Sequence, residues 1–358
     1  MSAGSTAGEN RLGLQPTDGG LWAAACIRNF CIRLTARNGR VPRITPVDKR
    51  NFMKQIAKRL LETIVVLLGV ILLIFIMLRV VPGDPVTTLL GEHVNQETVD
   101  RLTKTMHLDR PILEQFFLYV GGLFRGDMGQ SYKYNRPVTQ MIMDAFPYTL
   151  ALAIMASIFA WVLGLVLGIF AAVKQNHLLD HLFMGISLFG VSMPVFMAAL
   201  FLQYLFAFKW KILPLKADGS FLSMILPAIA LGWNSAGSVA RITRSSLLEA
   251  MQADYIDTAK AKGLLGRAVI MRHALKNSML PVITMMALQL SSMLSGAVIS
   301  ETVFAIPGIG RLATSAIENR DMPVLQGTVI FTTVIVIVGN FIADILYSVL
   351  DPRIRKAA

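Results

Sequence analysis

The histidines are the side chains best suited to metal binding or proton transfer, and the chain has only five of them, His93, His107, His177, His181 and His273. His177 and His181 are four residues apart, a spacing that can place two imidazoles on one face of a helix. A metal centre needs further ligands, and none lies near these two in the sequence. We therefore interpret them as a solvated pair at a membrane interface and expect no metal site.

The sequence also lacks the motifs of covalent and nucleotide chemistry. It contains neither a Ser-His-Asp arrangement nor a G-x-x-x-x-G-K-S/T phosphate loop. The two cysteines, Cys26 and Cys31, are five residues apart, which is not the C-x-x-C spacing of redox and zinc sites. We expect no catalytic residue in this chain and no cofactor bound to it.

Two carboxylates occur in or beside long apolar stretches, where a charge is costly and therefore a functional candidate. Asp344 lies seven residues before Asp351, about 10 Å from the end of its helix at 1.5 Å per residue. It either pairs with a basic residue or makes a direct functional contact. Glu301 stands just before the Pro307-Gly308 turn, where it either anchors that loop or makes such a contact.

The composition predicts the kind of helices that position these carboxylates. Of the 358 residues, 54% are hydrophobic and 16% are charged, against about 25% charged in soluble domains. The apolar residues form six runs that are too long for barrel strands and long enough for helices that satisfy their own backbone groups in lipid. We expect an all-α integral membrane protein with six transmembrane helices, at 60–81, 146–173, 182–208, 220–240, 278–303 and 324–348.

The net charge of +12 follows the membrane and does not indicate nucleic-acid binding. With the N-terminus inside, 22 of the 34 Lys and Arg residues fall in the inner segments and 12 in the outer ones. Because inner loops carry the excess of positive charge, both termini are expected on the cytoplasmic side.

Three segments outside the expected helices have distinct characters. Residues 1–52 are rich in Gly, Thr and Arg and are predicted to be disordered or a mis-assigned start, since Met53 begins a compact basic entry to the first helix. Residues 82–145 are long enough for a small outer cap. The loop 241–277 holds seven Lys and Arg, and its helix formers are interrupted by Gly263 and Gly266, so we expect short helices joined at a glycine corner.

The inner loop contains the block DYIDTAKAKG, from Asp254 to Gly263, and ends at NSMLP, 277–281. Further blocks lie on either side of it: VPGDP at 81–85, RGDMGQS at 125–131, FAIPGIGR at 304–311, NRDMPV at 319–324 and LDPRIR at 350–355. In their order, these blocks resemble the first permease subunit of ABC importers for dipeptides, oligopeptides, glutathione and nickel, and the block at 254–263 is similar to the EAA loop of these permeases. The resemblance covers Met53 to Arg355. The sequence departs from the family in its first 52 residues, and Asp257-Thr258-Ala259 replaces the general Glu-Ala-Ala.

The resemblance implies the type I ABC importer fold in a bacterial cytoplasmic (inner) membrane. Its partners would be a second homologous permease subunit, two cytoplasmic ATPases, an external substrate-binding protein and membrane lipid. ATP and Mg would be bound by the ATPases. The implied substrates are di- or oligopeptides, with nickel chelates or glutathione as the alternative.

The resemblance also implies that the inner loop docks on an ATPase. The residues that would carry this coupling are Asp254, Asp257, Thr258, Ala259, Lys260, Ala261, Lys262 and Gly263. On this interpretation the two alanines are small enough to enter a groove, the two lysines reach acidic groups at its rim, and Gly263 sets the corner. Arg241 and Arg244 would contact either lipid phosphates or the ATPase.

Polar and kinked positions within the apolar runs are the candidates for lining the translocation pathway. Proline in a membrane helix frees a backbone carbonyl, which is tolerated where protein or a water-filled cavity satisfies it. The candidates are Ser192, Pro194, Asn234, Gln289, Glu301 and Asp344.

Two other classes of function compete with this interpretation. A secondary transporter would show internal repeats and buried ion-coupling residues, and no convincing repeat relates the two halves. A membrane enzyme would need a convergent catalytic cluster, which is lacking. Gene neighbourhood separates the three, because an importer subunit should lie beside a second permease, two ATPases and a binding protein.

Overall fold

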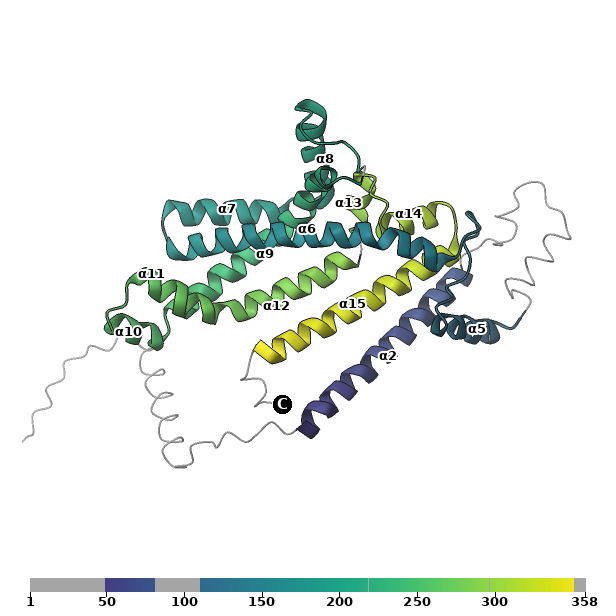
Figure 1. Ribbon diagram of the computed structural model, residues 1–358, viewed down its shortest axis with the longest axis horizontal. Helices are drawn as coiled ribbons and strands as arrows, with labels where there is room; N and C mark the ends of the chain where they lie inside the picture. The colour runs from purple at the N-terminus through teal and green to yellow at the C-terminus, as the bar shows by residue number, and fades with distance from the viewer. Residues whose placement is uncertain (1–48, 81–109, 218, 296, 351–358) are drawn as a thin grey trace, which may run out of the picture. The chain divides into compact units, whose positions relative to one another are not determined.

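The computed structural model describes residues 49–80, 110–217, 219–295 and 297–350, and the side chains of 61–77, 110–217, 219–295 and 297–343 within them (Figure 1). In these ranges the chain is helical, and its extended pairing is limited to one isolated bridge between Gln130 and Pro137. The prediction of an all-α fold is therefore confirmed. The predicted extension at 1–52 lies almost wholly outside the described residues, as do the blocks at 81–85 and 351–355.

The longest helices follow the apolar runs. They are α2 (Lys49–Val80), α6 (Val138–Val173), α9 (Phe221–Met251), α12 (Leu275–Leu294) and α15 (Met322–Leu350). Four segments are long and apolar enough to cross a membrane, namely Val138–Val173, Phe221–Met251, Gly266–Leu294 and Met322–Ala343. A bent pair of helices would make a fifth, and α2 contributes the shorter apolar segment Leu61–Met77. The described residues thus support four or five of the six predicted spans.

The predicted span 182–208 is broken in the structure, at the kinked position that the sequence indicated. Helix α7 (Leu178–Ser192) is followed by Met193 and Pro194, after which α8 (Val195–Leu202) begins and passes into the π-helix η1 (Gln203–Lys209). The two halves are bent by 103°. Proline has no N–H and forces the residue before it out of the helical region, and Met193 accordingly has φ −82° and ψ 123°.

The predicted boundaries around the inner loop also need correction. Helix α9 continues to Met251, eleven residues past the predicted end at 240. The charges from Arg241 onward change the polarity of the segment, but no proline or glycine interrupts the helix there. At the other side, the helical segment begins at Gly266 and ends at Leu294, and α13 (Val298–Val303) is separate from it. The predicted helix 278–303 is thus two elements.

Helices α6 and α9 pack along one another (Figure 1). Small residues form the seam between them. A Cβ added to Gly164 would lie 2.7 Å from the Cβ of Val239, and one added to Gly168 would lie 2.6 Å from the carbonyl oxygen of Ala240. Such contacts are typical of membrane helices, where small residues let backbones approach. Helix α7 packs on α6 and α9, whereas α12 packs on α9 and α15.

Different segments of the chain pack against the two ends of α6. At its first turns, Val138, Ile142 and Ala145 pack against α14 (Ile309–Glu318) and the start of α15. Because α6 begins at Val138, the last part of the predicted cap 82–145 belongs to this helix. The predicted cap also contains α5 (Ile112–Phe124), while its residues 82–109 lie outside the described part of the chain. The last turn of α6 contacts the segment that resembles the EAA loop.

Candidate functional site

The segment 254–263 forms a short helix with a glycine corner. Helix α10 (Asp254–Ala261) has Asp254 and Asp257 in its first turn and Lys260 in its last, the charge order that the helix dipole favours. Two residues after its end comes Gly263, whose φ is +77° and whose N–H donates to the carbonyl of Lys260 at 2.9 Å. The left-handed corner expected from the sequence is confirmed. A Cβ at Gly263 would meet nothing within 4 Å, so the constraint there is backbone strain alone.

One face of α10 is buried within the chain. Ile256 and Ala259 pack into an apolar cluster with Ala172 of α6, Leu247 of α9 and two residues after the corner, Val269 and Ala274. Ala259 is 6% exposed. The groove that this alanine enters therefore belongs to its own chain, which corrects the idea that Ala259 points outward to a partner.

Other residues of α10 and its corner are exposed, and we call them the coupling face after the role that the family resemblance implies. It consists of Asp254, Asp257, Thr258, Lys260, Ala261, Lys262 and Gly263. Asp257 and Lys260 pair with each other at 3.0 Å, although both remain exposed to solvent. Beside the corner, Leu265 is 82% exposed. The coupling face therefore places charges of both signs beside an exposed apolar side chain, and an apolar centre with a polar rim is typical of protein interfaces.

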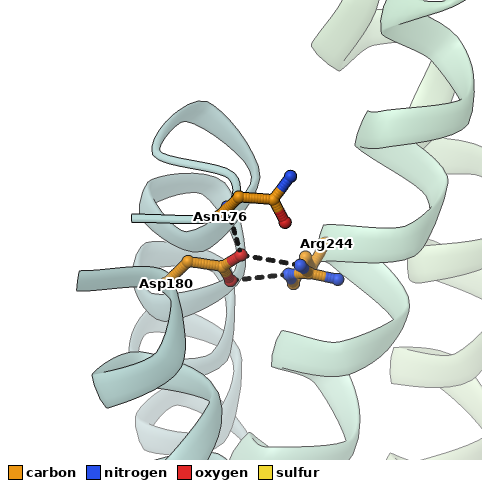
Figure 2. A network of polar contacts seen from close by, with 3 residues as sticks. All are labelled: Asn176, Asp180 and Arg244. Carbon is orange, nitrogen blue, oxygen red and sulfur yellow. Dashed lines mark hydrogen bonds and ion pairs between the residues drawn. The ribbon is translucent and has the colours of Figure 1, made fainter. Parts of the chain in front are cut away.

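An ion pair that the sequence analysis missed fixes α7 to α9 close to this cluster (Figure 2). Nε and Nη2 of Arg244 donate to Oδ1 and Oδ2 of Asp180, each at 2.7 Å. The backbone N–H of Asn176 donates to Oδ2 at 3.0 Å. Arg244 was expected to contact lipid or an ATPase, but in the structure it binds its own chain, whereas Arg241 is exposed. The sequence did contain one signal of this pair, because Asp180 is a lone aspartate at the start of an apolar run.

Asn234, one of the pathway candidates, contacts the end of α7 at the break before α8, where the candidates Ser192 and Pro194 also lie. The side-chain amide of Asn234 on α9 donates to the carbonyl oxygen of Val191 at 3.0 Å. In an unbroken helix that carbonyl would accept from Val195, and the break at Pro194 removes this partner. Asn234 thus satisfies a freed backbone group. Ser192, the last residue of α7, and Pro194 are both exposed.

Two further pathway candidates, Gln289 and Asp344, lie on α12 and α15. Gln289 on α12 is half-buried, and its Nε2 donates to the carbonyl of Ser235 at 3.3 Å, while its Oε1 is buried without a hydrogen-bond partner in the described structure. Asp344 lies in α15, but its side chain is outside the described part.

Glu301 is fully buried, 0% exposed, beside the start of α14. Its Oε1 accepts from the hydroxyl of Thr149 at 2.8 Å, and its Oε2 accepts from the backbone N–H of Arg311 at 3.0 Å. Burial raises the pKa of this carboxyl, while these hydrogen bonds act in the opposite direction. The contacts make Glu301 an anchor of the loop after α13, one of the two roles left open by the sequence.

The blocks at 125–131 and 319–324 come together at the same end of the bundle. Asp321, which is buried, accepts from the hydroxyl of Ser131 at 2.5 Å and from the backbone N–H groups of Tyr132 and Lys133 at 3.1 and 3.3 Å. Gly126 and Gly129 both have positive φ, which glycine adopts without steric cost, so the block at 125–131 forms turns. One carboxylate thereby joins two segments that are about 190 residues apart.

Known proteins are similar to this chain in sequence and in fold. Residues 164–356 match the family of binding-protein-dependent transport system inner membrane components, and residues 52–153 match the N-terminal family of such membrane components. The dipeptide transport system permease protein DppB of Escherichia coli is 38% identical over 332 residues, which cover 84% of this chain and 98% of that protein. The glutathione transport system permease protein GsiC of Shigella flexneri is 36% identical, covering 85% and 99%.

A solved structure of the MetNI methionine ABC transporter has the same fold. Its TM-score is 0.52 at 16% identity, and the likeness covers 59% of this chain and 97% of that one. The chain therefore has the fold of type I ABC importer permeases. The match to residues 164–356 alone covers more than half of the chain. The chain therefore belongs to the family of binding-protein-dependent transport system inner membrane components.

Proposed function

We propose that this chain is the permease subunit of an ATP-driven importer, in which it forms half of the translocation pathway for di- or oligopeptides. The proposal rests on one combination: the chain is similar to proteins named as peptide permeases, and α10 has an exposed coupling face. The relatives named for dipeptide transport match almost their whole length. The coupling face offers a partner a rigid helix whose other side is held by its own chain.

The proposed partners follow from this arrangement. Two cytoplasmic ATPases, which bind ATP and Mg, would dock on the coupling face of this subunit and of a second homologous permease. Movement of a helix seated on α6 and α9 would then pass into the membrane as a rigid-body shift. The coupling residues would be the exposed ones of α10 with Gly263, while Ala259 would act by seating the helix.

The proposed orientation places α10 in the cytoplasm with both termini, in an inner membrane. The opposite end of α6, with α14 and the loop held by Asp321, would then face the external binding protein. This assignment rests on the excess of Lys and Arg in the segments on the α10 side.

Glutathione is the second candidate substrate, because a relative named as a glutathione permease matches over 85% of this chain. The test is uptake by the complete complex, reconstituted in proteoliposomes with its partner subunits and binding protein. We expect ATP-dependent uptake of labelled di- and tripeptides that exceeds uptake of glutathione or of a nickel chelate. Preferred uptake of glutathione would select the second candidate, and uptake without ATP would contradict an ATP-driven importer.

A further inference from the structure

Helix α7 is attached to α9 by a polar contact at each of its two ends. In its first turn, both oxygens of Asp180 accept from the guanidinium of Arg244 (Figure 2). In its last turn, the carbonyl of Val191 accepts from the amide of Asn234. The two helices run antiparallel, so these contacts are separated by about 16 Å along α7, at 1.5 Å per residue.

Between these contacts, glycines let the two backbones approach closely. A Cβ added to Gly190 of α7 would collide with the indole of Trp233, and one added to Gly237 of α9 would collide with the carbonyl of Ser187. Helices held this closely leave no space for one to slide along the other without repacking. The interface is therefore close-packed where residues 187–190 meet residues 233–237, and the end of α7 beyond this stretch is held by the Asp180–Arg244 pair.

The ion pair also lies next to the seat of α10. Arg244 precedes Leu247 by three residues, one helical turn on the same helix. Leu247 is fully buried in the cluster that holds Ile256 and Ala259 of α10. A continuous path of contacts thus leads from the coupling face through the end of α9 to the first turn of α7.

The geometry of the pair suits positioning more than stabilisation. Asp180 is 1% exposed, and both of its oxygens are engaged in the planar, two-bond arrangement that arginine forms with a carboxylate. Buried ion pairs contribute little net stability, because desolvation offsets the attraction, but their geometry is specific. A lysine in place of Arg244 would keep the charge and lose the second parallel bond.

We infer that Asp180 and Arg244 are positioning residues for transport: their ion pair makes α7 move together with α9 when α10 is displaced. The bend at Met193–Pro194 then takes up the movement, and the α7–α9 interface keeps its packing. The inference rests on the proposed function, because it assumes that an ATPase displaces α10. It assigns the pair a role in converting ATP hydrolysis into transport, separate from contact with the ATPase.

The test compares substrate taken up per ATP hydrolysed in proteoliposomes that contain the complete complex. Two variants keep both charges but change the geometry: Arg244→Lys loses one bond, and Asp180→Glu moves the carboxylate by one methylene. We expect each to lower uptake per ATP about fivefold or more, the low end of typical coupling energies. ATP hydrolysis should persist, because the coupling face is unchanged. Glu249→Asp, a charge-preserving change at an exposed position of the same helix, is the matched control and should leave the ratio unaltered.

If the pair had a purely structural role, both variants would show wild-type uptake per ATP, because both retain the charge pair and complexes are compared only after assembly. Wild-type uptake per ATP in both assembled variants would overturn the inference. A wild-type complex without ATP-dependent uptake would contradict the proposed function instead.

Discussion

The hydroxyl of Thr149 on α6 lies 2.8 Å from the Oε1 of Glu301, a residue 152 positions further along the chain. The same hydroxyl accepts from the backbone N–H of Ile309 at 2.8 Å. One side chain therefore joins the first half of α6 to a buried carboxylate and to the first residue of α14. This end of the bundle depends on that hydroxyl for the satisfaction of two buried polar groups.

Thr149→Val should destabilise the protein, because it leaves a buried acceptor and a buried donor without their partner. A buried group that loses its hydrogen bond typically costs about 1–3 kcal/mol. The thermal midpoint of the purified, detergent-solubilised protein should fall. Thr328→Val is the control, since that buried hydroxyl bonds only to the carbonyl of Leu325 in its own helix. Equal midpoints for the two variants would contradict the role given to Thr149.

Gly263→Val should abolish transport while the protein still inserts. A β-branched residue at φ +77° is strained by roughly 1–3 kcal/mol, although no atom blocks its side chain. The displaced corner should reduce the amount of ATPase that copurifies with the chain. Gly266→Val is the matched control, because Gly266 is also open to solvent but does not have a positive φ. Normal uptake by Gly263→Val would exclude this corner as a coupling element.

Tryptophan at Ala259 and at Ala261 should have different effects, although both positions lie on α10. Ala259→Trp overfills the apolar seat, so the level of folded protein should fall, since overpacking commonly costs about 1–3 kcal/mol. Ala261→Trp points outward, so the protein should fold normally and lose its ATPase. Size-exclusion profiles and copurification separate the two effects. The same outcome for both variants would contradict the two-faced arrangement of α10.

Cysteine labelling tests the proposed orientation. In a background with Cys26→Ser and Cys31→Ser, Gln130→Cys should react with an impermeant reagent added to intact cells, because Gln130 is exposed at the α14 end. Leu265→Cys should react only after the membrane is opened, because it lies beside α10. The reverse pattern would invert the orientation.

The helices were predictable because lipid leaves few alternatives to them. Long runs without charge must satisfy their backbone groups internally, so the positions of α6, α9 and α15 followed from composition. The left-handed corner at Gly263 was also predictable, since a glycine after a run of helix formers has a known conformational use. The end of α9 was not, because a change in polarity marks the edge of the membrane and not the end of a helix.

The contacts between helices could not be predicted in the same way. Asp180 and Arg244 are 64 positions apart, and no local pattern relates them. Pro194 indicated a kink, but the angle of 103° depends on how both halves pack. The burial of Ala259 depends on Ala172, Leu247 and Val269, which come from three other segments.

The glycine seam limits how this protein can be engineered for greater thermal stability. Replacing helical glycine by alanine is a common route, worth about 0.4–1 kcal/mol where the native conformation accepts it. At Gly164, Gly168 and Gly232 the new methyl group would meet neighbouring atoms at 2.6–2.7 Å, so the exchange would force α6 and α9 apart. At Gly185, on the open side of α7, nothing lies within 4 Å. Stabilising substitutions therefore belong on that outward surface, and a homologue that carries alanine along the seam would need a different spacing between its helices.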